Sequence, residues 1–213
     1  AKSLLKDSWP LLLSSVAIVI YMKIDQIMLG QMVGDEEVGI YSAAVRISEV
    51  WYFIPMVIVA SVFPAILETK KRSEVQYYQR LQSLFDLMTL LSLPAALAMM
   101  FLSPHVVGLL FGDAYLDAAP VLAIHIWASL FVFLGVASSK WFLAENLQKL
   151  MLVRTLLGGL INILLNLLLI PSYGAVGAAI ALVVTQSVGT LIYDHFREDT
   201  RRLFYMQLST LNL

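Results

Sequence analysis

Four ionisable side chains lie inside two long apolar stretches of the sequence, where they could bind a charged ligand or carry a proton. Lys23 and Asp25 belong to the first stretch, and Arg46 and Glu49 belong to the second. A charge at the centre of a bilayer costs roughly 2.5–3.5 kcal/mol even on the lenient insertion scale, so such groups face something other than lipid. We therefore predict that these four side chains line a polar cavity.

The alternative interpretation is that the four charges only join helices. At 1.5 Å per residue, Asp25 and Arg46 lie about 9 Å from the outer helix ends, and Lys23 and Glu49 about 12–14 Å, so opposite charges match in depth. At 100° per residue, Lys23 and Asp25 point about 200° apart, whereas Gln26 shares the face of Lys23. Asp25 must therefore face a different neighbour, and both interpretations remain open.

A second set of polar side chains lies in the last two apolar stretches. Asn162 and Asn166 are four residues apart, and Thr185 follows in the next stretch. Carboxylate and amide oxygens are the ligands that a hard cation prefers. Asn side chains and small residues also join membrane helices. The pattern leaves a cation site and a packing face open, and we interpret His125 as a packing residue.

Helices that span a bilayer must position these side chains. Hydrophobic residues make up 60% of the 213 residues and charged residues 14%, which is too apolar for a soluble domain. Six segments reach the length of about 20 mostly apolar residues that a spanning helix needs, namely 9–32, 40–67, 81–102, 118–143, 150–170 and 175–196. We predict an all-α integral membrane protein with a single six-helix lobe over residues 1–213, in which the cytoplasmic tail 197–213 either docks or frays.

Basic residues occur only in alternate connections. Lys and Arg precede the first segment and follow the second, fourth and sixth segments, whereas the stretches 34–38, 103–117 and 171–174 contain none. Cytoplasmic loops of membrane proteins carry the excess of Lys and Arg. Both termini are therefore predicted to be cytoplasmic.

The sequence carries no pattern typical of an enzyme. It contains no Gly-rich phosphate loop, no His/Glu pair at metal-binding spacing and no nucleophile beside a base. It contains no cysteine, which excludes disulfides and thiolate metal sites. A soluble basic surface for nucleic acid is also missing. We expect a protein that is not an enzyme and holds no cofactor.

Several motifs resemble those of Wzx-type oligosaccharide flippases. They are YMKIDQIMLG at 21–30, EVGIYSAAVR at 37–46, EVWYFIP at 49–55, LFG at 110–112, AAP at 118–120, NLLLIP at 166–171 and GAVGAA at 174–179. The resemblance implies the fold of the multidrug/oligosaccharidyl-lipid/polysaccharide (MOP) superfamily, with two six-helix lobes around a central cavity. The chain resembles the second, C-terminal lobe, so we expect it to be a fragment whose N-terminal six-helix lobe is missing.

The resemblance also implies a function. Such flippases move an undecaprenyl-pyrophosphate-linked oligosaccharide, an O-antigen or exopolysaccharide repeat unit, from the cytoplasmic to the periplasmic leaflet of the bacterial inner membrane by alternating access. On this hypothesis Lys23 and Arg46 contact the anionic head group, while Gln26 and Trp51 contact sugars. Polysaccharide polymerase machinery would be a further partner.

In the same hypothesis Asp25 and Glu49 hold the basic groups in place. Related flippases have a cation site made by an acid on the helix equivalent to the first one here, an Asn/Asp pair on the fifth and a Thr on the sixth. The matching positions are Asp25, Asn162 and Asn166, and Thr185 lies one turn beyond the expected Thr. The implied coupling ion is H⁺ or Na⁺.

Two other functions stay open. A drug/cation antiporter of the same superfamily would favour acidic cavity walls. A membrane scaffold without transport activity would use the charges only to join helices.

Overall fold

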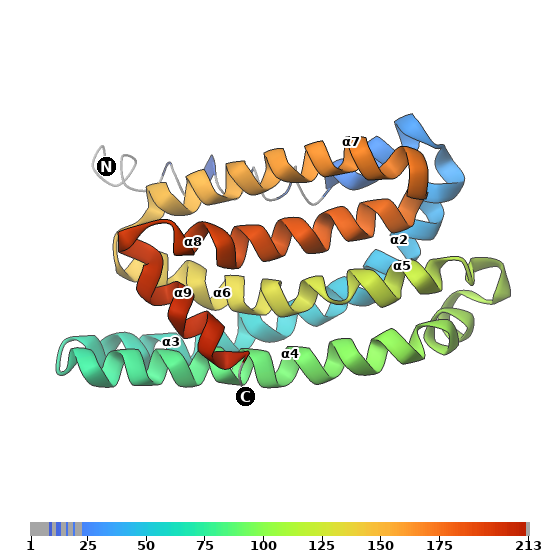
Figure 1. Cartoon of the computed structure of the whole chain (residues 1–213). Coiled ribbons are helices and arrows are strands. Elements are labelled where there is room, and N and C mark those ends of the chain that lie inside the picture. Colours follow the sequence, from blue (N-terminus) through green and yellow to red (C-terminus); the bar gives the residue numbers. More distant parts are fainter. Residues whose placement is uncertain (1–8, 10–11, 14–15, 17–18, 20–22, 212–213) are drawn as a thin grey trace.

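The computed structural model describes residues 9, 12–13, 16, 19 and 23–211, and no strand occurs among them. Helical residues 23–32 come first and are followed by an ordered series of helices (Figure 1). These are α2 (Asp35–Glu49), η1 (Val50–Tyr52), α3 (Phe53–Lys70), α4 (Glu74–Phe111), η2 (Asp113–Tyr115), α5 (Ala118–His125), α6 (Ala128–Ala144), α7 (Gln148–Ser187), η3 (Val188–Ile192), α8 (Tyr193–His195) and α9 (Glu198–Thr210).

Four helical stretches in the described part of the chain are long and apolar enough to cross a membrane: Asp35–Lys70, Glu74–Phe111, Ala118–Ala144 and Gln148–His195. The chain is therefore a multi-pass helical membrane protein. Part of the first predicted span, 9–32, lies outside the described residues, so the count of six spans and the cytoplasmic termini stay predictions.

The longest stretch reverses direction within α7 (Figure 1). Gly174 has φ 52° and ψ −133°, a backbone conformation that residues with a Cβ atom rarely adopt. The first leg of α7, 148–173, and the second leg, 175–187, are therefore antiparallel. A Glu37 oxygen accepts a hydrogen bond of 2.6 Å from the Ala175 amide, which stabilises the start of the second leg because its first amides have no helical partners.

The connections alternate between the two ends of the bundle. The turns between α3 and α4, between α6 and α7 and between α8 and α9 lie at one end, and the turns before α2, between α4 and α5 and within α7 lie at the other (Figure 1). The first group contains the basic connections and the second group the connections without Lys or Arg. This alternation is the one that the charge pattern predicts.

Two apolar clusters hold the bundle together. One contains Leu29, Tyr41, Leu122 and Ile170, and joins helix 23–32 to α2, α5 and α7. The other joins α3, α4, α6 and α9 through residues that include Phe63, Phe85, Phe133 and Leu203. Burial of each such side chain contributes roughly 1.5–3 kcal/mol, so these clusters fix the helices around the polar groups.

The C-terminal segment is docked and does not fray over its described residues. Helix α9 packs against α4 and the preceding turn η3. The Gln207 amide donates a hydrogen bond of 2.7 Å to the Ser138 hydroxyl of α6, and the Thr210 and Thr89 hydroxyls lie 2.9 Å apart. Helix α9 is thus part of the lobe.

The substitution Leu203→Ala is expected to lower the free energy of unfolding by about 2–4 kcal/mol, because it leaves a cavity in the second cluster. Leu203 is 1% exposed and Leu208, five residues later on the same helix, is 40% exposed. Leu208→Ala is the matched control and should change stability by about 0.5 kcal/mol or less. Denaturant titration in detergent measures both values. Equal effects would show that α9 is not docked in the folded protein.

Candidate functional site

A partly open cavity of about 290 Å³ lies in the lobe. It is bounded by α2, α6, both legs of α7 and η3, with Asp25 contributed by helix 23–32. The polar groups on its wall include Asp25, Glu49, His125, Arg154 and Thr185. A cavity of this size has room for several water molecules, which the polar groups on its mostly apolar wall can bind.

Asp25 is the most enclosed acid of this wall, with 1% of its surface exposed. The Tyr41 hydroxyl donates a hydrogen bond of 2.8 Å to one carboxylate oxygen, and the Asn166 amide donates one of 2.5 Å to the other. The same Asn166 nitrogen lies 3.3 Å from the Asn162 amide oxygen. Asp25 thus joins helix 23–32 to α2 and to the first leg of α7.

Three buried polar atoms near this carboxylate have no hydrogen-bond partner in the described part of the chain. They are the Asn166 amide oxygen, the Asn162 amide nitrogen and the Thr185 hydroxyl. A buried polar group without a partner costs about 1–3 kcal/mol. Thr185 reaches this region from the second leg, since its methyl group would lie 3.8 Å from a Cβ atom at Gly158, one turn before Asn162.

This set of groups fits a monovalent hard cation. Asp25, Asn162, Asn166 and Thr185 together offer carboxylate, amide and hydroxyl oxygens, which are the ligands of such ions. Amide oxygen and nitrogen are assigned from the hydrogen-bond network and can exchange places by a flip. No group of three or more His, Cys, Asp or Glu residues that could hold a metal ion occurs among the described residues.

The structure separates the other predicted site residues from this cluster. Lys23 and Arg46 are exposed on the lobe surface, and Gln26 and Trp51 are half-buried. Those four residues do not line the cavity, whereas Glu49 does. The residues expected to line one polar cavity are therefore divided between the cavity, which Asp25 and Glu49 line, and the exposed bases Lys23 and Arg46, here called the exposed basic face.

The proposed interhelical charge pairs do not form in the described part of the chain. No ion pair there includes Lys23, Asp25, Arg46 or Glu49. Lys23 attracts the Glu49 carboxylate only over a longer distance. The sequence estimate that these charges lie at similar depths in the membrane therefore does not imply that their side chains are in contact.

Sequence reasoning missed Tyr41 and named His125 only as a packing residue. Tyr41 binds Asp25 directly, and its ring meets the His125 ring edge at a centroid distance of 5.8 Å. The His125 Nδ1 atom lies 2.8 Å from the Ser48 hydroxyl, so this histidine is a hydrogen-bonded member of the cavity wall. The available signal was the position of Tyr41 within the motif EVGIYSAAVR, four residues before the cavity-lining Val45.

Comparison with known sequences identifies the family. A family model described as polysaccharide biosynthesis protein matches residues 1–120, which is more than half of the chain. The chain belongs to this polysaccharide biosynthesis protein family. The match confirms the resemblance to polysaccharide-exporting flippases from which the sequence predictions were drawn, while the assignment to one lobe stays a prediction.

Curated relatives of this polysaccharide biosynthesis protein are named as flippases. It is 25% identical over 197 residues to the "Probable low-salt glycan biosynthesis flippase Agl15" of Haloferax volcanii, a match that covers 92% of this chain and 42% of the relative. It is 29% identical over 178 residues to the "Probable flippase AglR" of the same organism, a match that covers 81% of this chain and 37% of the relative.

The chain spans less than half the length of these relatives. No solved structure matches the chain significantly. The two relatives are archaeal, so location in a bacterial inner membrane stays a prediction.

Proposed function

We propose that this chain is part of a glycan flippase that moves a lipid-linked oligosaccharide across the membrane by alternating access, with a monovalent cation bound at Asp25 as the coupling ion. The observation that carries the proposal is the division of the polar groups. One acid is enclosed within the lobe, while two basic groups at similar depth lie on its outer surface.

The exposed basic face supports the part of the proposal that concerns the substrate. Lys23 and Arg46 belong to apolar stretches and lie on the surface of the described lobe. A charge at this depth avoids acyl chains, so the face that carries them borders water, a ligand or another part of the complete protein. Phosphate groups form short charge-assisted hydrogen bonds with Lys and Arg, which suits the anionic head of a lipid-linked sugar.

The Asp25 cluster supports the part that concerns coupling. Tyr41 links Asp25 to α2, the helix that carries Arg46, and Asn166 links it to α7. A cation bound to the carboxylate would compete with both hydrogen bonds and use the unpartnered amide and hydroxyl oxygens. Ion binding would then change the contacts between the helices that carry the exposed basic face. The ion would bind one conformation of the lobe more tightly than the other and so shift the equilibrium between them.

The test replaces both exposed bases with Gln in the complete protein. The double variant K23Q/R46Q should lower the amount of surface polysaccharide by about tenfold or more, since a hydrogen bond to a charged group is worth roughly 1.5–3 kcal/mol. The matched control is K71Q/R72Q, which removes two exposed bases from the connection between α3 and α4.

The control should export polysaccharide normally. Unchanged export by K23Q/R46Q at normal membrane levels would contradict the proposed substrate face and would favour the scaffold function. Loss of resistance to organic cations with unchanged polysaccharide would favour the antiporter.

A further inference from the structure

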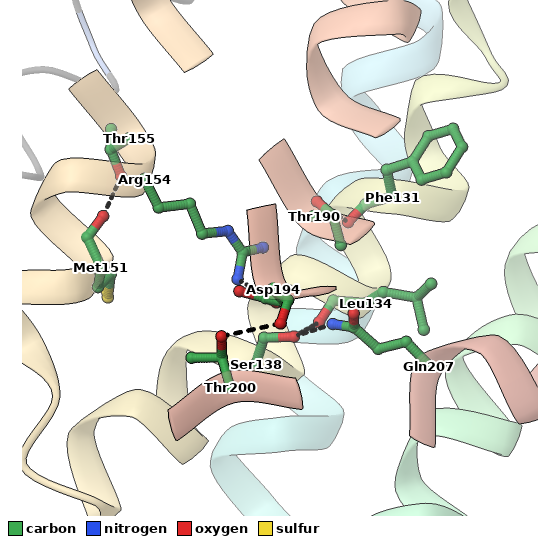
Figure 2. A network of polar contacts seen from close by, with 10 residues as sticks. All are labelled: Phe131, Leu134, Ser138, Met151, Arg154, Thr155, Thr190, Asp194, Thr200 and Gln207. Carbon is green, nitrogen blue, oxygen red and sulfur yellow. Dashed lines mark hydrogen bonds and ion pairs between the residues drawn. The ribbon is translucent and has the colours of Figure 1, made fainter. Parts of the chain in front are cut away.

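A buried ion pair begins at the cavity wall, because Arg154 lines the cavity and Asp194 lies behind it, outside the lining. Arg154 of the first leg of α7 reaches Asp194 of α8, with 3.1 Å between the guanidinium nitrogen and the carboxylate oxygen (Figure 2). The Asp194 side chain is fully buried and that of Arg154 is 11% exposed. The pair joins the first leg of α7 to α8, at the end of the bundle opposite the turn within α7. This is the end with the basic connections (Figure 1).

Only one of the two oxygens of the Asp194 carboxylate has a hydrogen-bond partner among the described residues. Arg154 binds one oxygen of Asp194, while the other oxygen is buried and has no partner among the described groups. The Thr200 hydroxyl binds the main-chain oxygen of Asp194 and leaves the carboxylate free. An arginine and a carboxylate built only for structure commonly form two parallel hydrogen bonds. The single contact leaves coordination capacity at Asp194 for another cation.

Arg154 connects this carboxylate to the site at Asp25. Its side chain lines the same cavity as Asp25 and Thr185. Arg154 precedes Asn162 by eight residues and Asn166, which binds Asp25, by twelve. The backbone at Arg154 therefore lies about 12–18 Å from the Asp25 cluster along α7. Among the described residues of the cavity wall, Asp25 and Glu49 are acids, Arg154 is the arginine, and His125 is bonded to Ser48. Two carboxylates against one guanidinium favour cations within the cavity.

The surroundings also allow the guanidinium to move. Arg154 lies 5.4 Å from the centre of the Phe142 ring, a cation–π contact that can hold the guanidinium without a carboxylate. The segment between Thr185 and Asp194 contains the π-helical turn Val188–Ile192. Such turns occur mostly as local irregularities at functional sites, and a change of register there would move Asp194 relative to Arg154.

We propose that Asp194 is a second site for a monovalent cation, which the Arg154 guanidinium occupies as a built-in cation until an ion that has left the Asp25 cluster displaces it. The inference rests on the proposed function only for the source of that ion. Removal of the guanidinium alone leaves a buried carboxylate without its counter-charge. Exchange for an ion keeps the carboxylate paired, so exchange is the accessible route.

The test counts bound sodium by equilibrium binding of ²²Na⁺ to the complete purified protein at pH 8. R154Q should bind one more Na⁺ per chain than the parent protein, and R154Q/D194N should return to the parent number. The double variant removes both charges, and such replacements of a buried pair are commonly tolerated. K149Q, at an exposed position on the same helix, is the matched control and should bind the parent number.

Binding to R154Q equal to that of the parent, in protein that remains monodisperse, would overturn the proposal and leave the pair a structural contact. The variant R154Q/D25N separates this test from the proposed coupling site. If R154Q/D25N binds one Na⁺ and R154Q/D25N/D194N binds none, the Asp194 site is supported. This holds even if D25N shows that Asp25 itself binds no Na⁺.

A second measurement applies if R154Q fails to fold. D194N in the otherwise unchanged protein should bind the parent number of ions but release ²²Na⁺ about tenfold more slowly, because an intermediate site on the way out is lost. A release rate equal to that of the parent would overturn the proposal.

Discussion

Asp25→Asn is expected to abolish Na⁺ binding at the candidate cation site and to reduce glycan export by about 100-fold, the effect of losing roughly 3 kcal/mol of interaction with a charged group. Asn has the same shape as Asp, so it can still accept a hydrogen bond from Tyr41 and preserve the packing of a side chain that is 1% exposed. It cannot supply the negative charge that offsets the dehydration of a cation. Equilibrium binding of ²²Na⁺ and the amount of surface polysaccharide are the two measurements.

The matched control is Asp35→Asn, an exposed acid in the first turn of α2. It should leave Na⁺ binding and export unchanged. Retention of both by the Asp25 variant would place the coupling site elsewhere. Loss of export with normal Na⁺ binding would show that Asp25 acts in another step of the transport cycle.

Gly174→Ala is expected to lower the free energy of unfolding by about 3–5 kcal/mol. A backbone conformation that is essentially restricted to glycine costs about 1–3 kcal/mol for a residue with a Cβ atom. That Cβ atom would also lie 2.5 Å from a Glu37 oxygen. The Glu37 side chain would have to shift and lose the hydrogen bond that the Ala175 amide donates to it, at a further cost of about 1–3 kcal/mol. Thermal unfolding in detergent measures the loss.

Gly39→Ala is the matched control, because Gly39 lies within α2 and a Cβ atom there would meet nothing within 4 Å. It should change stability slightly or raise it by up to about 1 kcal/mol, since Ala is the better helix former. Equal stability of the Gly174 and Gly39 variants would show that the hairpin of α7 does not depend on this turn. Glu37→Gln keeps the glycine and should show only the smaller effect of the weakened hydrogen bond.

Much of the local structure could be predicted from residue types. One predicted span ended at residue 170, before Pro171, and the next began at residue 175, after Gly174. In the structure the chain reverses direction at Gly174. The 3.6-residue period predicted that Asp25 faces away from Lys23, and the structure buries Asp25 and exposes Lys23. Both predictions rest on local backbone geometry, which a short stretch of sequence determines.

The composition of the site could be predicted only in part. Asp25, Asn162 and Asn166 were named as a set through the resemblance, and the structure brings them together. Glu49 and Arg46 were expected to line the same cavity, yet Glu49 lines it while Arg46 lies on the surface. Depth and helix face do not specify which neighbouring helix a side chain meets, because that depends on how several helices pack.

The sequence by itself determined that this protein is a bundle of membrane helices with polar groups inside its apolar stretches. Lipid offers no hydrogen bonds to the backbone, so an apolar stretch of sufficient length must form a helix. Tertiary structure alone decided that α9 docks, that Arg154 meets Asp194 across α7, and that Asp25 meets an amide 141 residues away. Such contacts join residues far apart in the chain, and only the packing of complete helices brings them within hydrogen-bond distance.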